Sequence, residues 1–355
     1  MSFFMGAFLA TFTVAAQTLF LNNFDEKSDL PGAFTIAGAF GIAATVTYNF
    51  LQRKIRFQYL AVLFLLIVTA VTTAIEFGDL YFPDKKTIYF YGFTQLIPFT
   101  LIILLVFWGA FNRLFNVRQS KRLLGTVDQG ALVASLISFF AIPVVLPYLP
   151  GENENEKAES LYTISLVSVI LFTIMFITLS TKFGGERWSL AQERLKNQKV
   201  RVVDFLKNKY LILLSFFIII SIVSLNFVEY SFLSASTLRF KPEELANFLA
   251  LFEATIVIFS FLFQAFAADR IMVDYGLRVS ILINPTLIAL FTIGALVIGF
   301  TIDFKEINSS FTIFFVMIAM SKLFIYSTKE SLDEPAFKLY QLPVDPNVKI
   351  DVQTK

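Results

Sequence analysis

Long apolar runs separated by short polar segments follow one another along the whole chain. Each run holds about 20 residues, the length that a helix needs to cross the hydrocarbon core of a bilayer. The runs predict transmembrane helices at residues 3–21, 32–50, 58–75, 88–111, 127–148, 161–180, 210–230, 244–267, 278–301 and 309–327. The pattern therefore indicates an all-α polytopic membrane protein with ten spans.

Polar segments group these predicted helices into six and four. The longest one, 182–209, alternates charged and apolar residues, which predicts amphipathic helices at the cytoplasmic membrane surface; a plain solvated linker is the alternative. The chain then consists of a six-helix bundle (1–181), this linker, a four-helix bundle (210–328) and a cytoplasmic tail (329–355). The layout resembles the major facilitator architecture, and we expect a further helix pair to complete a 6+6 arrangement.

Composition agrees with a membrane location. Charged residues make up 16% of the chain, against about 25% in soluble domains, so the lipid bilayer is the first partner that we expect. The chain has no cysteine and no histidine, which excludes thiol and imidazole catalysis and most transition-metal sites. The sequence also lacks a Gly-rich phosphate loop and a catalytic dyad. We therefore expect no enzyme activity, no cofactor, no metal and no nucleic-acid partner.

The charge of the loops alternates along the chain and predicts the orientation. The segments 50–57, 112–126 and 181–209 are net basic, whereas the segments between them and the later loops 229–244 and 303–306 are net acidic. Basic loops face the cytoplasm under the positive-inside rule. Ten spans then place both termini in the cytoplasm, and we expect the membrane to be a bacterial inner membrane.

Glu253 is the first candidate for a transport path, because a charged side chain within a span usually faces the bundle interior. It lies about eight residues into its predicted helix, and helical spacing places Ser260 and Gln264 on the same face. A carboxylate that contacts an ion or substrate is one interpretation. A structural glutamate, protonated or paired with a neighbour, is the other.

Lys322, Gln17 and Gln95 complete the candidate path. Lys322 near the end of the last span either contacts an anionic substrate or extends to the interface as a snorkelling side chain. Gln17 follows Gly6 and Thr13 on one helix face, and Gln95 lies on a weaker polar stripe. Stripes of small and hydroxyl residues also serve as packing surfaces between helices, so both interpretations stay open.

Candidate gating residues lie in the basic loops. They are Arg113, Lys121, Arg122 and Asp128 between the fourth and fifth spans, and Asp269 with Arg270 between the eighth and ninth. The basic residues are also explained as topology determinants. Asp128 is also explained as a helix-start residue paired with a neighbouring arginine. The Asp269-Arg270 pair resembles the gating element of facilitators, and an ordinary loop ion pair is its alternative.

Two separated stretches carry a family resemblance. The first contains Phe107-Trp108-Gly109, Asn112, Lys121-Arg122, Gly125 and Gly130, and the second contains Ser331-Leu332, Pro335 and Leu342-Pro343-Val344-Asp345. In type and approximate spacing they resemble the bacterial and plastid ATP/ADP translocases, the Npt-type nucleotide transporters. The resemblance implies a carrier that works by alternating access. It also implies a small organic anion as substrate, with nucleotide exchange of the ATP/ADP type as one form.

The first predicted helix departs from this family. The family carries a charged run where this chain has the uncharged sequence 15–19, so the chain more closely resembles divergent, facilitator-like members. Such members are often fused to helical-repeat or cyclic-nucleotide modules, which implies a possible cytoplasmic partner of that kind. The alternative function is therefore a non-transporting membrane sensor or anchor for a regulatory domain. A water-accessible cavity lined by Glu253 would distinguish a carrier from a sensor.

Overall fold

A computed structural model describes most of the chain. The described residues are 1–52, 54–78, 84–115, 117–151, 153–183, 209–268, 270–301, 309–333 and 336, with the side chains of 117–128, 211, 301, 309 and 310 left out. The predicted amphipathic linker falls almost wholly outside this part of the chain. Pro335 and the Leu342-Pro343-Val344-Asp345 segment of the second family stretch also lie outside it. The amphipathic linker therefore remains a prediction.

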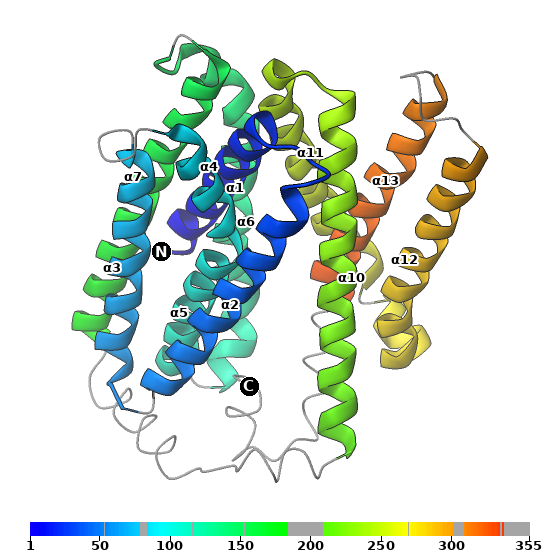
Figure 1. Cartoon of the computed structure of the whole chain (residues 1–355). Coiled ribbons are helices and arrows are strands. Elements are labelled where there is room, and N and C mark those ends of the chain that lie inside the picture. Colours follow the sequence, from blue (N-terminus) through cyan, green and yellow to red (C-terminus); the bar gives the residue numbers. More distant parts are fainter. Residues whose placement is uncertain are drawn as a thin grey trace. The chain divides into compact units, whose positions relative to one another are not determined.

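The described residues form helices throughout (Figure 1). The α-helices are α1 (Ser2–Asn23), α2 (Leu30–Gln52), α3 (Phe57–Glu76), α4 (Lys85–Thr94), α5 (Leu96–Leu114), α6 (Val117–Val145), α7 (Glu154–Phe183), α10 (Lys209–Arg239), α11 (Pro242–Phe263), α12 (Gly276–Thr301) and α13 (Ser309–Thr328). A 3-10 turn, η2 (Leu146–Tyr148), follows α6, and η3 (Gln264–Ala268), η4 (Ile271–Tyr275) and η5 (Lys329–Asp333) are π-helical. Ten helices in the described residues are long and apolar enough to cross a membrane, which confirms the predicted number.

Two predicted spans differ from the helices observed. The span predicted at 88–111 is broken at Gln95 into α4 and α5, because Pro98 has no N–H with which to continue the hydrogen-bond ladder to Thr94. The span predicted to end at residue 230 continues as α10 to Arg239. Glu229 therefore lies inside a helix, and its assignment to the acidic 229–244 loop was wrong.

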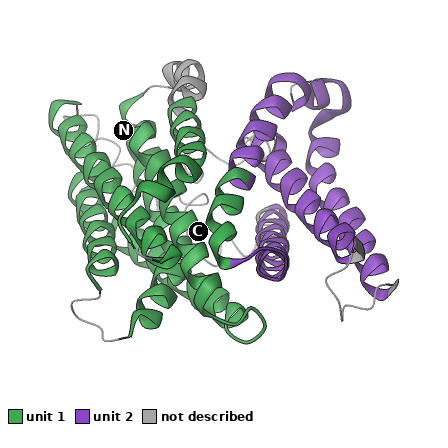
Figure 2. Cartoon of the chain, turned by 90° about the horizontal axis from the view of Figure 1, so that it is seen from above, with its two compact units in different colours: residues 1–198, 242–251, 354–355 green, residues 199–241, 252–353 purple. Residues whose placement is uncertain are grey.

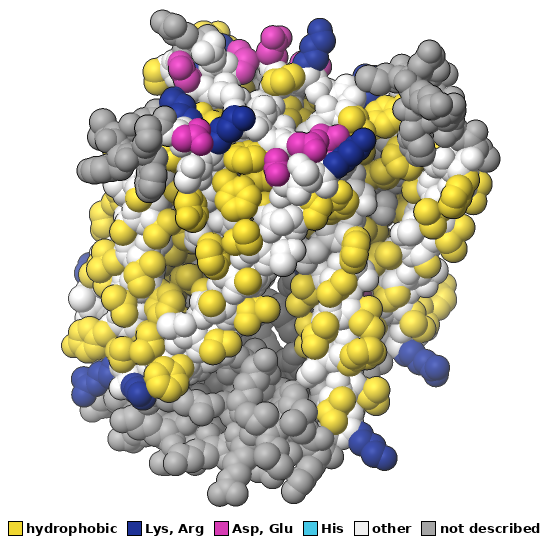
Figure 3. Space-filling view, viewed as in Figure 1, with side chains coloured by type: hydrophobic (Ala, Val, Ile, Leu, Met, Phe, Trp, Pro, Cys, Tyr) yellow, Lys and Arg dark blue, Asp and Glu magenta, His cyan; other side chains and the backbone are white. Residues whose placement is uncertain are grey.

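The chain divides into two compact units, drawn in different colours in Figure 2. The first unit contains α1 to α7 and the start of α11 as far as Leu251. The second contains α10, the rest of α11 from Phe252, η3, η4, α12, α13 and η5. Along the described helices, hydrophobic side chains cover the middle and acidic side chains gather near helix ends (Figure 3). That distribution is typical of segments that cross a bilayer.

In the first unit, α1 is the central helix. It packs against α6 and α7 and also contacts α4 and α5. Its Phe12 ring lies 5.2 Å from the Phe99 ring and 5.4 Å from the Tyr162 ring, centroid to centroid, and Thr11 shares a 2.8 Å hydrogen bond with Ser165 of α7. A helix that is apolar all round is expected to be buried on every side, and α1 is.

The α1 and α6 backbones approach closely at Gly6. A Cβ atom there would overlap the carbonyl group of Ala131, and Ser135 Oγ donates a 3.2 Å hydrogen bond to the Gly6 carbonyl. Gly6 belongs to the polar and small-residue face that it shares with Thr13 and Gln17 in the first predicted span. Around Gly6, this face packs closely against α6.

Gly6→Ala is therefore expected to destabilise the protein by about 1–3 kcal/mol, as overpacking does. Gly38→Ala is the matched control, since Gly38 lies within α2 and a Cβ there has nothing within 4 Å. This control should be neutral or stabilising by up to about 1 kcal/mol, because alanine favours helix over glycine. Denaturant unfolding of both variants in the same detergent measures the difference. Equal stabilities would contradict the close approach of α1 and α6.

In the second unit, α13 packs against both α10 and α12. Leu225 and Val228 of α10 meet Ile325 of α13 in a buried cluster, with Leu287 and Ile288 of α12 against it. The π-helical turns η3 and η5 contact each other. Pi-helical turns are rare and occur often at functional sites. The second unit therefore combines an apolar core with a backbone conformation that is typical of functional sites.

Candidate functional site

Lys322 lies at the centre of a buried cluster of charged side chains in the second unit. Its Nζ atom donates a 2.7 Å hydrogen bond to Glu253 Oε1 and a 3.0 Å hydrogen bond to Glu229. The three residues come from α13, α11 and α10, so the cluster connects three helices through side chains rather than through backbone. Two carboxylates share one ammonium group, and the cluster carries a net charge of −1 when all three groups are ionised.

Aromatic rings enclose the ammonium group. Lys322 Nζ lies 4.3 Å from the centre of the Phe232 ring, 5.8 Å from that of Phe252 and 5.6 Å from that of Tyr326. The Phe232 and Phe252 rings stack with centroids 4.4 Å apart. A cation over a ring face is attracted by about 0.5–2 kcal/mol, and by most where water is excluded. The rings therefore help to hold the charge of Lys322 in an apolar environment.

Helical spacing explains why these groups meet. On α10, Phe232 follows Glu229 by three residues, and on α13, Tyr326 follows Lys322 by four, so each pair shares one helix face. On α11, Phe252 directly precedes Glu253. Each helix thus contributes one charged residue and a neighbouring ring.

Burial makes this arrangement costly to disturb. The Lys322 side chain is 1% exposed, that of Glu229 12% and that of Glu253 18%. A charged side chain near the centre of a bilayer costs about 2.5–3.5 kcal/mol on insertion scales, which mutual pairing offsets. Removal of one member of a buried ion pair costs about 3–5 kcal/mol, because the other charge stays behind without its partner. The cluster therefore depends on all of its members.

The structure brings together two of the predicted path residues, Glu253 and Lys322. Lys322 is buried and ion-paired, so it does not extend to the interface. Ser260 is also buried, but it lies about 10 Å further along α11, since seven residues separate it from Glu253. Gln264 is exposed at the start of η3. Gln264 therefore differs from the other two residues in burial, and its assignment to the path remains a prediction.

The other predicted path residues belong to the first unit. Gln17 is buried in α1, within the packing surface of that helix. Gln95 is half-buried at the break between α4 and α5. Their assignment to a transport path remains a prediction.

Of the predicted gating residues, Arg113 and Arg270 have described side chains. The Arg113 guanidinium lies 3.9 Å from the centre of the Phe57 ring, and Nη1 donates a 2.9 Å hydrogen bond to the Gly109 carbonyl. A Cβ atom on Gly109 would lie 2.8 Å from the Phe57 ring, so this glycine leaves space for the ring. Gly109 of the family stretch thus has a packing role near the end of α5.

The remaining gating predictions are not tested. Arg270 is exposed and precedes η4. The side chains of Lys121, Arg122 and Asp128, and the whole of Asp269, lie outside the described residues.

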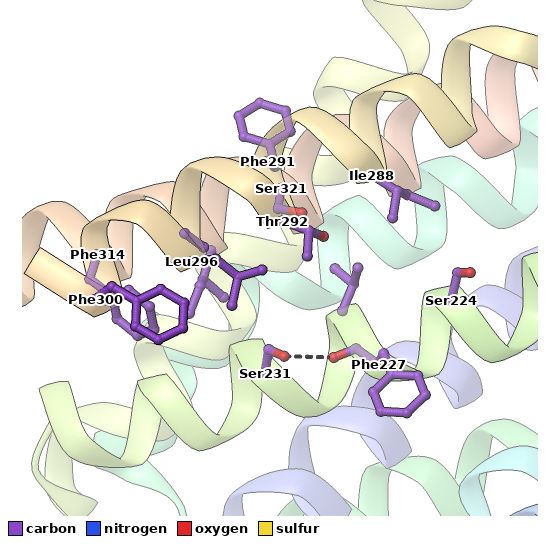
Figure 4. Close-up of a pocket in the computed structure, with 14 residues that line it drawn as sticks. Ser224, Phe227, Ser231, Ile288, Phe291, Thr292, Leu296, Phe300, Phe314 and Ser321 are labelled. Atoms are coloured by element: carbon purple, nitrogen blue, oxygen red, sulfur yellow. Dashed lines mark hydrogen bonds between the residues drawn. The ribbon is translucent and has the colours of Figure 1, made fainter.

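A cavity of about 560 Å³ lies between α10, α12 and α13 (Figure 4). It is lined mainly by aliphatic and aromatic side chains, with the hydroxyl groups of Ser224, Ser231, Thr292 and Ser321 among them. Ser321 directly precedes Lys322, and successive helical residues point about 100° apart, so the cavity occupies another face of α13. Since no charged side chain lines it, it is not suited to a phosphate group.

Glu229 is the member of the cluster that sequence reasoning missed. It was assigned to a loop because the predicted span ended at residue 230. The signal that could have found it is the absence of glycine and proline between Glu229 and Pro242. Proline at the first position of α11 marks where the next helix begins, and the preceding helix continues almost to that point.

Comparisons with known proteins agree with this architecture. A family model described as the TLC ATP/ADP transporter matches residues 84–354. A mutant form of the nucleoside transporter NupG has a TM-score of 0.61 at 13% identity, and the match covers 99% of this chain and 84% of that chain. The inward-open xylose transporter XylE from E. coli has a TM-score of 0.59 at 12% identity, with coverage of 99% and 84%. No curated protein matches the chain.

The likeness to NupG and XylE shows a shared fold. Both are major facilitator transporters, so the predicted fold class of an all-helical, facilitator-like membrane protein is confirmed. At this level of identity neither structure indicates the substrate of this chain.

Proposed function

Because the chain belongs to the TLC ATP/ADP transporter family, we propose that the Lys322 cluster is where this membrane transporter holds its anionic substrate. The family and the fold are those of carriers that work by alternating access. A nucleotide fits the family, and it is the substrate that we propose. The proposal rests on one observation above all: a lysine that is 1% exposed, within the apolar part of a transmembrane helix.

The chemistry of the cluster supports this role. An ammonium group has three N–H donors and no acceptor, so a phosphate oxygen can replace either carboxylate as its partner. The Glu253 side chain is the most exposed of the three, and its bond to Lys322 is the one that an incoming anion would exchange. If the cluster served stability alone, apolar residues would serve as well, since a buried ion pair often stabilises a fold no more than well-packed apolar side chains do.

Orientation and partners extend the proposal. We place both termini in the cytoplasm of a bacterial inner membrane, supported by the net basic charge of the loops 50–57, 112–126 and 181–209. A helical-repeat or cyclic-nucleotide module, where one is attached, would then meet the carrier on its cytoplasmic side. Fusion of a reporter enzyme that is active on one side of the membrane to each terminus tests this placement.

Uptake into proteoliposomes tests the proposed function. Labelled ATP and ADP should accumulate, whereas uncharged adenosine should not, because it has no group for Lys322 to bind. Glu253→Gln should reduce net ATP uptake about tenfold or more, because the carboxylate that replaces the departing anion on Lys322 is then lost, and a hydrogen bond between charged groups contributes about 1.5–3 kcal/mol.

Glu243→Gln is the control for this variant. Glu243 lies exposed in the first turn of the same helix, and the substitution should leave uptake unchanged. If a folded protein took up none of the charged nucleotides, the nucleotide proposal would be rejected. Unchanged uptake by the Glu253 variant would leave that residue with a structural role.

A further inference from the structure

Arg113 lies where three helices of the first unit meet. It is half-buried near the end of α5, and its guanidinium lies 3.9 Å from the centre of the Phe57 ring at the start of α3. Its Nη1 atom donates a hydrogen bond to the Gly109 carbonyl, one turn earlier on α5. Tyr48 near the end of α2 is 2% exposed and acts electrostatically on the same guanidinium. The charge of Arg113 is therefore held in a defined place among packed helices.

No acidic side chain of the described residues pairs with this charge. The sequences of α2 and α5 contain no aspartate or glutamate, and Glu76 lies at the opposite end of α3 from Phe57. The acidic residues of α7 lie in its first two turns, whereas α7 contacts Phe57 near its other end, through Phe176. The side chain of Asp128 on α6 lies outside the described residues. Arg113 takes part in none of the described ion pairs.

One donor of Arg113 is also left without a partner. The Nε–H group is buried, and among the described residues no acceptor forms a hydrogen bond with it. A buried donor without a partner costs about 1–3 kcal/mol. The guanidinium as a whole is only half-buried, so a ligand can reach it. A partly desolvated cation with a free donor is suited to an anion from outside the described chain.

We propose that Arg113 and Tyr48 form a binding site for a phosphate group, which either a phospholipid headgroup or free phosphate can supply. The fork of N–H groups on a guanidinium matches two oxygens of one phosphate, and arginine is more weakly hydrated than lysine. The Tyr48 hydroxyl is a further donor for the same group. This site lies in the first unit and does not involve the Lys322 cluster, so the inference goes beyond the proposed function.

The surroundings of Arg113 favour a phospholipid as the source of the phosphate. The site lies at the ends of apolar helices that are long enough to cross a membrane, where lipid headgroups are expected. Exposed Lys54 and Arg56 follow in the adjoining loop, and Lys54 Nζ lies 4.2 Å from the centre of the exposed Phe50 ring. Each basic residue near the membrane surface attracts anionic lipids by about 1 kcal/mol. We therefore expect an anionic phospholipid to occupy the site.

Thermal unfolding with added lipid tests this inference. Phosphatidylglycerol is titrated into the delipidated full-length protein in detergent, and the rise in unfolding temperature gives an apparent affinity, since a ligand of the folded state stabilises it. Arg113→Gln should weaken this affinity about tenfold or more, because hydrogen bonds between charged groups are lost. Arg113→Lys should weaken it as well, because lysine keeps the charge but lacks the planar fork.

Arg239→Gln is the matched control. Arg239 is an exposed arginine at the end of α10, and its guanidinium lies 5.8 Å from the centre of the Phe240 ring. The substitution removes the same charge from another place, so the affinity for phosphatidylglycerol should equal that of the wild type. The unfolding temperature of each variant without lipid shows whether it is folded. Arg113→Lys retains the cation over Phe57, so it provides the test even if Arg113→Gln does not fold.

Inorganic phosphate and phosphatidylcholine distinguish the sources. Phosphatidylcholine has no net charge, and we expect it to bind more weakly than phosphatidylglycerol. If inorganic phosphate stabilises the protein as phosphatidylglycerol does, with the same dependence on Arg113, the phosphate site stands and the lipid assignment is overturned. If phosphatidylglycerol stabilises the wild type and both Arg113 variants equally, or stabilises none of them, the site itself is rejected. Neither result affects the proposed role of Lys322, which nucleotide uptake tests separately.

Discussion

Lys322→Met is expected to destabilise the protein by about 3–5 kcal/mol, because it leaves Glu229 and Glu253 buried without their shared cation. Methionine has a similar length and an apolar side chain, so the loss of charge dominates the effect over any loss of volume. We expect a much lower yield of folded protein and a lower unfolding temperature in detergent. Thermal unfolding of the purified variant measures this change.

A charge-balanced variant separates the structural role of Lys322 from its proposed role in transport. The triple substitution Lys322→Met, Glu229→Gln and Glu253→Gln removes every charge of the cluster and should recover most of the lost stability. It should still take up no nucleotide, since the ammonium group is absent. Uptake by this triple variant at the wild-type rate would show that the cluster serves the fold alone. A stable single Lys322→Met variant would contradict the described ion pairs.

Phe232→Ala is expected to cost about 3–5 kcal/mol, as truncation of a buried phenylalanine does. Phe232 is fully buried, stacks on Phe252 and also contacts Lys322 through its ring face. Its removal opens a cavity directly beside the charged cluster, so we expect weaker ATP binding together with lower stability. Denaturant unfolding and ATP binding of the same preparations measure both effects.

Two further substitutions distinguish the contributions of Phe232. Phe227→Ala is the matched control, since Phe227 lies on the same helix and is 67% exposed; it should change stability by less than about 0.5 kcal/mol. Phe232→Leu keeps an apolar side chain but removes the ring face, so its additional cost reports the contact with Lys322, about 0.5–2 kcal/mol. If Phe227→Ala proved as harmful as Phe232→Ala, the described packing of α10 would be wrong.

The helices themselves could be predicted from apolar run length, because a bilayer fixes how many apolar residues a spanning helix needs. The two corrected boundaries have local causes. Pro98 interrupts the fourth predicted span, and α10 continues beyond residue 230 because nothing in 231–239 ends a helix. Helix ends depend on capping and on packing as well as on hydropathy. The length of an apolar run therefore predicted that a helix is present more accurately than it predicted the residues at which the helix begins and ends.

The candidate site was predicted in part. Glu253 and Lys322 were recognised separately, because a charge inside an apolar run is conspicuous whatever it contacts. Their pairing could not be predicted, since 69 positions separate them in the chain and helical periodicity relates only residues on one helix. Glu229 was missed for a different reason: an error of several residues at a helix end moved a buried carboxylate into a loop.

The sequence by itself determined that this is a membrane protein and predicted the ten apolar helices that the described residues contain, and its motifs indicated the family to which it belongs. These properties depend on composition and on order along the chain. The tertiary structure decided that Lys322 meets two carboxylates and three aromatic rings, and that Gly6 and Gly109 serve close packing. Such contacts join different helices, and their relative rotation and register are set by packing that no single helix encodes. The charged cluster around Lys322 is therefore a property of the folded protein.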